Sequence, residues 1–147
     1  MSEVELAQEV ADALISIAKR SLATDPVVMP TSGRVEVPLS DLDGREDFQL
    51  DIRRARIDLK KGTKQTRTRQ AIILVRLDFG GAPHRNPDGG EVKCPHIHLY
   101  KEGYGDKWAY PLPDGRFSDV DDFWQTLKDF LQFCNVVEPP TFQRGLF

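Results

Sequence analysis

The sequence predicts a single α+β domain over residues 1–147, in which an antiparallel sheet is flanked by an N-terminal helix and a C-terminal helix. Apolar residues recur at helical spacing near both ends of the chain, and they alternate with polar residues in the middle. At 147 residues the chain is long enough to bury a core without disulfides. An apolar content of 39% with 29% charged residues is typical of a globular protein.

The first expected element is an amphipathic helix over residues from about 3 to 22. Asp25-Pro26 and Met29-Pro30 are expected to end it, because proline cannot continue a helix. Its apolar stripe consists of Val4, Ala7, Val10, Ala11, Leu14, Ile17 and Ala18.

The sheet is expected over residues from about 35 to 112. Val35–Leu39 alternates, but Pro38 lacks an N–H donor, which limits this segment to an edge strand at best. Short alternating strands follow at 48–52 and 57–59. The strongest strand is Ala71–Phe79, AIILVRLDF, whose β-branched residues favour a central position. Strict alternation puts Arg76 and Asp78 on one face with Ile72 and Leu74, and Ile73, Val75, Leu77 and Phe79 on the other.

All three histidines fall within fifteen residues directly after this strand. His84 lies in a Gly- and Pro-rich loop, and His96 and His98 share one face of the next strand, PHIHLY, with Tyr100. If the two strands pair antiparallel across the loop, their polar faces meet. The expected patch contains Arg76, Asp78, His96, His98 and Tyr100, with His84 above it.

The chain is expected to close with a strand at WAYPL, a helix over about 118–134 and a tail over 135–147. Ser118 with Asp121 three residues later is a variant capping box that predicts the start of this helix. Its apolar positions are expected to cover the sheet. The tail is predicted to be an ordered extension or a partner-binding arm.

The charge is small overall but unevenly distributed. The net charge is −3, yet eight basic residues lie between Arg53 and Arg69 with the single acid Asp58, and five aspartates lie in 114–129. A basic face of this kind suits phosphates or an acidic partner, although a solvated surface is an equal alternative. The basic residues that we expect to bind nucleic acid or a protein partner are Arg53, Arg56, Lys64, Arg67 and Arg69.

The sequence also predicts a cytoplasmic protein that does not contact a membrane. No apolar stretch approaches the roughly 18 residues that a membrane span requires, and the acidic N-terminus does not resemble a secretory signal. Cys94 and Cys134, the two cysteines, have no disulfide-framework spacing and fit reduced thiols.

Three interpretations of the histidine patch remain open. In the first, the chain cleaves RNA without a metal: His84, His96 and His98 are acid–base catalysts, Arg76 stabilises the charge at phosphorus, and Asp78 orients a ring. In the second, zinc binds His84, His96 and His98, with Asp78 and Cys94 also available as ligands and Arg76 as an unfavourable neighbouring charge. In the third, His96 and His98 have a structural role only: they are satisfied by hydrogen bonds within a sheet face that a helix covers, and Arg76 and Asp78 pair with cross-strand neighbours.

The segments RLD, PHRNPDGGE and PHIHLYKEGYGDKWAYPL, followed by FLQFCNVVEPP, resemble a family of small uncharacterised bacterial and prophage proteins. More loosely, the Arg76–Asp78 strand, the loop His84 and the P-H-x-H strand with His96 and His98 resemble the toxin half of TumE-type toxin–antitoxin pairs. This second resemblance implies a cytoplasmic toxin that a cognate antitoxin holds. The longer N-terminal helix and the extended loop depart from the toxin pattern.

We therefore expect a toxin-like ribonuclease or nucleic-acid-processing protein, with RNA or a nucleoprotein as its target and no obligatory cofactor, zinc being the candidate if one is present. The alternative from another class is a phage-derived protein that binds a host or defence complex and catalyses nothing. In that case the basic run or the acidic 114–129 segment contacts the partner, and the histidines only shape a rigid hairpin.

Overall fold

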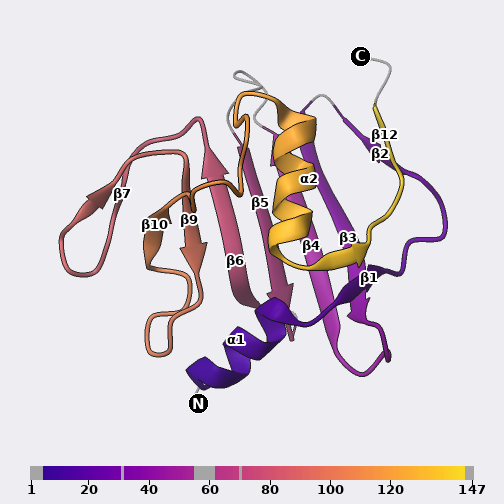
Figure 1. Ribbon diagram of the computed structural model, residues 1–147, viewed down its shortest axis with the longest axis horizontal. Helices are drawn as coiled ribbons and strands as arrows, with labels where there is room; N and C mark the ends of the chain where they lie inside the picture. The colour runs from indigo at the N-terminus through magenta and orange to yellow at the C-terminus, as the bar shows by residue number, and fades with distance from the viewer. Residues whose placement is uncertain (1–4, 31, 55–61, 70, 145–147) are drawn as a thin grey trace.

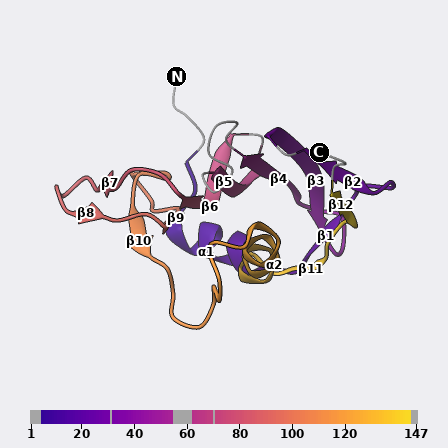
Figure 2. The same cartoon turned by 90° about the horizontal axis from the view of Figure 1, so that it is seen from above.

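The computed structural model describes residues 5–30, 32–54, 62–69 and 71–144. Within these ranges eight strands form one sheet, with the two helices packed on one of its faces (Figures 1 and 2). The α+β class predicted from the sequence is confirmed. In sheet order the strands are β10 (Ala109–Pro111), β9 (His96–Leu99), β6 (Ile72–Phe79), β5 (Gly62–Thr68), β4 (Asp47–Arg54), β3 (Gly33–Asp41), β1 (Lys19–Ser21) and β11 (Val136–Glu138).

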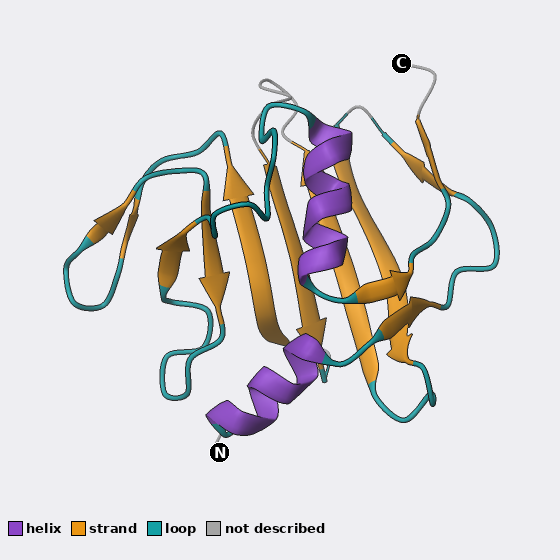
Figure 3. Cartoon of the chain, in the orientation of Figure 1, coloured by secondary structure: helices purple, strands orange, loops and turns teal. Residues whose placement is uncertain are grey.

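Neighbouring strands in this sheet are antiparallel, except that β1 and β11 are parallel. Two small sheets lie outside it: β2 (Val27–Met29) pairs with β12 (Phe142–Arg144), and β7 (His84–Arg85) pairs with β8 (Glu91–Val92). Figure 3 shows the β7 hairpin projecting beyond the edge of the main sheet. The predicted tail is therefore an ordered extension as far as Arg144, because both β11 and β12 come from it.

The core lies between the sheet and the helices α1 (Gln8–Ser16) and α2 (Phe123–Phe133). We call this the helix-covered face of the sheet. Figure 2 shows both helices on this same side. The fully buried side chains here include Leu39, Leu50, Ile52, Leu77, Ile97, Leu127 and Phe130.

The predicted helix over 3–22 is too long, because α1 ends at Ser16 and Ile17 has extended backbone angles. The chain enters the sheet at Lys19 instead of continuing the helix. The Lys19 ammonium group is buried and donates to the carbonyls of Ile15, Ile17 and Cys134. It therefore satisfies carbonyl groups at the C-terminal ends of both helices, those of Ile15 and Ile17 at α1 and that of Cys134 at α2.

The interpretation of Val35–Leu39 as an edge strand at best is wrong, because β3 lies between β4 and β1. The reason is local: β1 pairs only with Leu39–Asp41. The carbonyl of Pro38 accepts a hydrogen bond from Leu22 N, directly after the end of β1. The nitrogen of Pro38 points to this same side of the strand, where β1 has ended, so its missing N–H removes little pairing. The strand at 48–52 is confirmed as part of β4, whereas the expected strand at 57–59 lies outside the described residues.

Strand β6 confirms the predicted central strand but not its strict alternation. Thr66 pairs with Val75 and Arg67 with Ile73, which leaves Leu74 as an extra residue in a β-bulge. Ile73 consequently lies on the same face as Arg76 and Asp78, contrary to expectation. Ile72 packs against the core instead.

The C-terminal helix is shorter than the predicted 118–134, and its cap differs. Asp122, not Ser118, is the N-cap: its Oδ1 accepts hydrogen bonds from the backbone N–H groups of Trp124 and Gln125. Ser118 binds the Asp129 carboxylate through its backbone N–H and hydroxyl.

Candidate functional site

The antiparallel pairing of β6 with β9 brings the predicted polar residues together. In this register His98 lies opposite Arg76, and His96 lies opposite Asp78. The Arg76 Nη2 to His98 Nε2 distance is 3.1 Å, which confirms the predicted pairing of these strands. Four of the expected patch residues are thus in one cluster.

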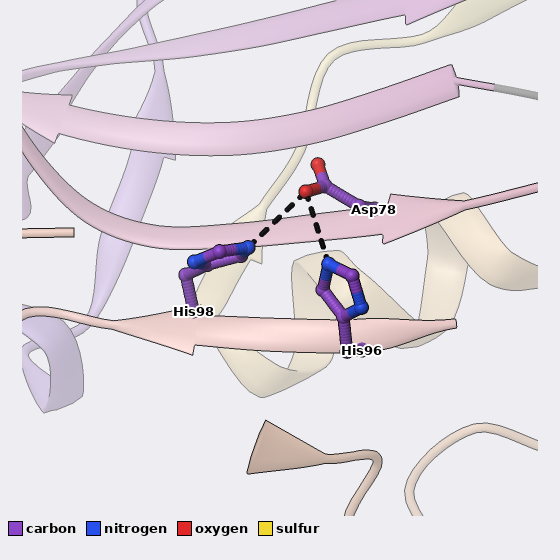
Figure 4. Close-up of side chains that lie close together, drawn as sticks. All are labelled: Asp78, His96 and His98. Carbon is purple, nitrogen blue, oxygen red and sulfur yellow. Dashed lines mark hydrogen bonds and ion pairs between the residues drawn. The ribbon is translucent and has the colours of Figure 1, made fainter. Parts of the chain in front are cut away.

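Asp78 is at the centre of this cluster, which Figure 4 shows. Its Oδ2 lies 3.3 Å from His96 Nε2 and 3.2 Å from His98 Nε2. Its Oδ1 accepts from the Thr63 hydroxyl at 3.2 Å and lies 3.4 Å from Arg76 Nε. Partial burial opposes ionisation of Asp78, but the hydrogen bond with His98 and the positive charge of Arg76 outweigh it and lower the pKa of the carboxyl to about 2.

Arg76 is held by two carboxylates. Besides Asp78, its Nη1 donates to Asp106 Oδ2 at 2.7 Å. The backbone carbonyl of Asp106 also lies 2.8 Å from His98 Nδ1. Asp106 was not predicted to belong to the site. It lies in the turn between β9 and β10, and only the folding of this turn back onto β6 brings it to Arg76.

Each histidine has one ring nitrogen next to a backbone carbonyl. The pairs are His98 Nδ1 with Asp106 O at 2.8 Å, His96 Nδ1 with Lys93 O at 3.3 Å, and His84 Nε2 with Lys107 O at 2.7 Å. A carbonyl only accepts hydrogen bonds, so each of these nitrogens carries a hydrogen. A neutral ring at His96 or His98 would therefore present an unprotonated Nε2 atom to Asp78.

The three rings differ in exposure. His96 and His98 have 2% and 0% of their surface exposed, whereas His84 is only partly buried. His84 packs edge-on against His98 with ring centroids 4.6 Å apart, and the prediction that it lies above the patch is correct. Direct acid–base contact of His96 or His98 with a large substrate, as expected from the sequence, is at odds with this burial.

Tyr100 does not belong to the cluster, contrary to expectation. Strand β9 ends at Leu99, and the Tyr100 hydroxyl both donates to Leu6 O and accepts from Leu6 N, at 2.9 Å each. Tyr100 is buried in the core, where it fixes the segment that precedes α1. Its contacts indicate a structural role.

The face of the sheet opposite the helices carries a cavity of about 920 Å³. We call this the open face, since no helix of the described ranges covers it. Asp78 and Arg76 are at one side of the cavity, and Arg34 is a lining residue that the sequence did not single out. The charged lining residues are Arg34, Arg53, Arg67, Arg76, Asp51 and Asp78.

The predicted basic binding residues have separate positions. Arg53 is exposed and lines the cavity, and Arg67 lines it while paired with Asp51 at 2.6 Å. Arg69 is in the turn after β5 and pairs with Glu46 at 3.5 Å. Arg56 lies outside the described residues.

Lys64 is not available to a partner, which corrects its prediction as a binding residue. Alternation along β5 turns it to the helix-covered face, where none of its surface is exposed. Its Nζ lies 4.2 Å from the ring centroid of Phe79 and 4.0 Å from that of Phe123. Burial, and secondarily the charge of Arg54, lower the pKa of Lys64 to about 7.

Among the described residues, Asp78, His96 and His98 form the one group of three potential metal ligands whose ligand atoms lie close together. One potential ligand atom from each lies within 4.8 Å of the others. This set differs from the three histidines proposed from the sequence, because Asp78 takes the place of His84. Cys94, another sequence candidate, instead donates its Sγ hydrogen to Asp78 O at 3.2 Å.

Comparison with protein families identifies the family of this chain but no activity. A family described as a family of unknown function, DUF6978, matches residues 6–136. The chain belongs to this family. The match includes β6, β9 and hence Asp78, His96 and His98. The chain has no significant match among curated proteins or solved structures.

The DUF6978 match confirms the resemblance to an uncharacterised family. The TumE-type resemblance and the cytoplasmic location stay predictions. No helix in the described ranges is long and apolar enough to cross a membrane.

Proposed function

We propose that this DUF6978 protein binds a nucleic-acid strand on the open face and processes its phosphodiester bonds. The observation that carries the proposal is the cavity, in which four arginines outnumber two aspartates and one side is formed by Arg76 and Asp78. Arginine suits phosphate because its planar guanidinium donates two parallel hydrogen bonds to phosphate oxygens. An open β-sheet face also offers the length that an extended strand needs.

The reaction that fits this cavity is cleavage of RNA through its 2′-hydroxyl. The hydroxyl oxygen bonds to phosphorus as its proton passes to a base, and the bond from phosphorus to the 5′-oxygen breaks as that oxygen takes up a proton from solvent water. Arg76, at the cavity and fixed by Asp106, is positioned to stabilise the charge at phosphorus. His84 is the base candidate, because it is the least buried histidine and its Nδ1 has no hydrogen-bond partner among the described residues.

Binding is tested with a fluorescently labelled single-stranded RNA and anisotropy measurements over a range of salt concentrations. We expect Arg53→Glu to weaken binding and to reduce the salt dependence, because each lost phosphate contact lowers the slope by about one. The matched control is Lys128→Glu, the same change of charge at an exposed position of α2 on the other side of the sheet. Equal affinities of the two variants would contradict binding on the open face.

Processing is tested by RNA cleavage and by expression in bacteria. Wild-type protein is expected to cleave RNA and to slow growth, and Arg76→Ala is expected to relieve both effects. An RNA that is bound but never cleaved, with growth unaffected, would remove the enzymatic part of the proposal.

A second candidate is a binding protein without catalysis, and the burial of His96 and His98 favours it. Buried rings whose nitrogens all have neighbours can serve to hold the β6–β9 pairing rigid. In that case reversing the charge of Arg53 abolishes partner binding, whereas His96→Gln leaves it intact. The acidic 114–129 segment is the other candidate surface, and charge reversal of Asp121 tests it in the same assay.

A further inference from the structure

We infer that Asp78, His96 and His98 form a binding site for one divalent transition-metal ion of the zinc class. The ligand atoms are Asp78 Oδ2 and the Nε2 atoms of His96 and His98. This inference does not depend on nucleic-acid binding, since it rests on the geometry of the three side chains.

The first argument is that three acceptor atoms converge. The carbonyls of Lys93 and Asp106 fix a hydrogen on each Nδ1, so both Nε2 atoms of the neutral rings have lone pairs. Both lone pairs face one carboxylate oxygen, at 3.3 and 3.2 Å. Three buried or partly buried acceptors at such distances repel one another unless a cation, either a metal ion or an added ring proton, lies between them.

The second argument is the spacing of these atoms. Zinc binds nitrogen and carboxylate oxygen at about 2.0–2.2 Å, and tetrahedral geometry then separates two ligand atoms by about 3.3 Å. The two oxygen–nitrogen distances, 3.3 and 3.2 Å, agree with this value, and dashed lines mark these pairs in Figure 4; the ligand atoms of the two histidines lie within 4.8 Å of each other. A donor set of two imidazoles and one carboxylate suits zinc and similar transition metals, whereas magnesium and calcium prefer oxygen ligands only.

The third argument is that a second shell of contacts orients every ligand. Metal-binding histidines commonly donate their other N–H to a backbone carbonyl, as both rings do here. The oxygen of Asp78 that is not a proposed ligand, Oδ1, is held by the Thr63 hydroxyl and by Arg76 Nε. These contacts therefore orient all three ligands toward one point.

Protonation of the rings explains the cluster less well than a metal does. A hydrogen on His98 Nε2 would point toward Asp78 but would also compete with the N–H of Arg76 Nη2, only 3.1 Å from the same nitrogen. Arg76 has an alternative partner in Asp106 at 2.7 Å. We therefore assign Arg76 as the cation that occupies the His98 lone pair when no metal is bound and that withdraws toward Asp106 when metal binds.

The test is titration of the full chain with Zn²⁺ after treatment with a chelator, followed by calorimetry. We expect one equivalent to bind and Asp78→Asn, which keeps the size of the side chain, to weaken binding at least about 100-fold, since loss of a second-shell partner alone costs 10–100-fold. The matched control is His84→Gln, whose ring touches His98 but whose nitrogens lie outside the convergent group, and its affinity is expected to stay within threefold of wild type. Arg76→Met is expected to bind Zn²⁺ more tightly, and weaker binding would overturn the competition assigned to Arg76.

The visible absorption of the wild-type protein with Co²⁺ provides a readout that needs no variant. Four-coordinate Co²⁺ absorbs far more strongly than six-coordinate Co²⁺, so an intense visible band supports the site, and a weak one contradicts it. Absence of Zn²⁺ binding to the wild type, or unchanged binding in a folded Asp78→Asn variant, would overturn the proposal. RNA binding by the same samples is measured separately, so failure of the metal site and failure of the proposed function are distinguishable.

Discussion

The two faces of the central sheet handle charge in opposite ways. On the helix-covered face, Lys64 is buried between the rings of Phe79 and Phe123, and among the described residues its ammonium has no hydrogen-bond partner. On the open face, Arg67 of the same strand is paired with Asp51 and Glu36. Aromatic rings thus surround the ammonium of Lys64, and carboxylates surround the guanidinium of Arg67.

This difference separates stability from function within one sheet. The helix-covered face has the apolar core, in which close packing makes each lost side chain costly. The open face has polar contacts next to a cavity, and substitutions there are expected to alter binding more than folding. Strand β5 contributes to both faces, because its residues alternate between them.

Phe130→Ala is expected to have the largest effect on folding. Phe130 is fully buried in α2 against the sheet, and truncation of such a ring leaves a cavity that costs about 3–5 kcal/mol in the free energy of unfolding. Urea unfolding followed by circular dichroism measures this loss. Arg53→Ala on the open face is the control and is expected to change stability by less than about 0.5 kcal/mol. Similar losses in both variants would contradict the division between the faces.

Lys64→Met is expected to stabilise the protein by about 3 kcal/mol at pH 6. The lowered pKa measures the free-energy cost of burying the charged ammonium, at about 1.4 kcal/mol for each tenfold change in proton affinity. Methionine removes this cost, and the loss of the cation–π contacts offsets about 2 kcal/mol of the gain in stability. The folded-state pKa of about 7 is below the ordinary value of 10.5. Between these values the unfolded chain binds the extra proton, so wild-type stability rises with pH.

The difference between Lys64→Met and wild type should therefore shrink as the pH rises from 6 to 10. Urea unfolding of both proteins at several pH values measures it. The difference in free energy of unfolding between the two proteins is compared because burial also lowers the pKa of Lys19, to about 8. Lys19 therefore contributes the same pH dependence to both proteins, and it cancels in the difference. A constant difference across this range would show that folding does not lower the pKa of Lys64.

The site was predictable to the extent that it depends on local alternation. The period of two in β6 and β9 is enough to bring Arg76 and Asp78 to His98 and His96. Asp106 was not predictable in this way, because a turn brings it to Arg76 from another part of the hairpin. Tyr100 was misplaced because alternation was extended one residue beyond the end of β9.

The fold was predictable where strands are apolar and not where they are polar. Strand β5, GTKQTRT, contains no large apolar residue, yet it lies in the interior of the sheet. Its pairing with β4 and β6 supplies the backbone hydrogen bonds, and Thr66, Thr68 and the stem of Lys64 fill the core positions. Similarly, Lys19 has no apolar signal, and its burial is explained by its three carbonyl partners and by the ring of Phe48, whose centroid lies 4.9 Å from the Lys19 Nζ.

Asp51→Asn is expected to have the smallest effect and to titrate in the opposite direction from Lys64. Burial opposes ionisation of Asp51, but hydrogen bonds from Arg67, Gln65 and Gln49 outweigh it and lower the pKa of the carboxyl. We expect a loss of about 1 kcal/mol in the free energy of unfolding at pH 7, as is typical for a partly buried charged hydrogen bond.

A lowered folded-state pKa of Asp51 contributes stability above the unfolded value of about 3.9, and this contribution is lost as the pH falls through the folded value. The difference between variant and wild type should therefore disappear under acid, where that of Lys64→Met persists. Urea unfolding at pH 7 and pH 3 checks this, with Asp43→Asn in the exposed β3–β4 turn as a control that is expected to be neutral at both. If Asp51→Asn lowered the free energy of unfolding as much at pH 3 as at pH 7, the shape of the Asp51 side chain, and not its charge, would stabilise the open face.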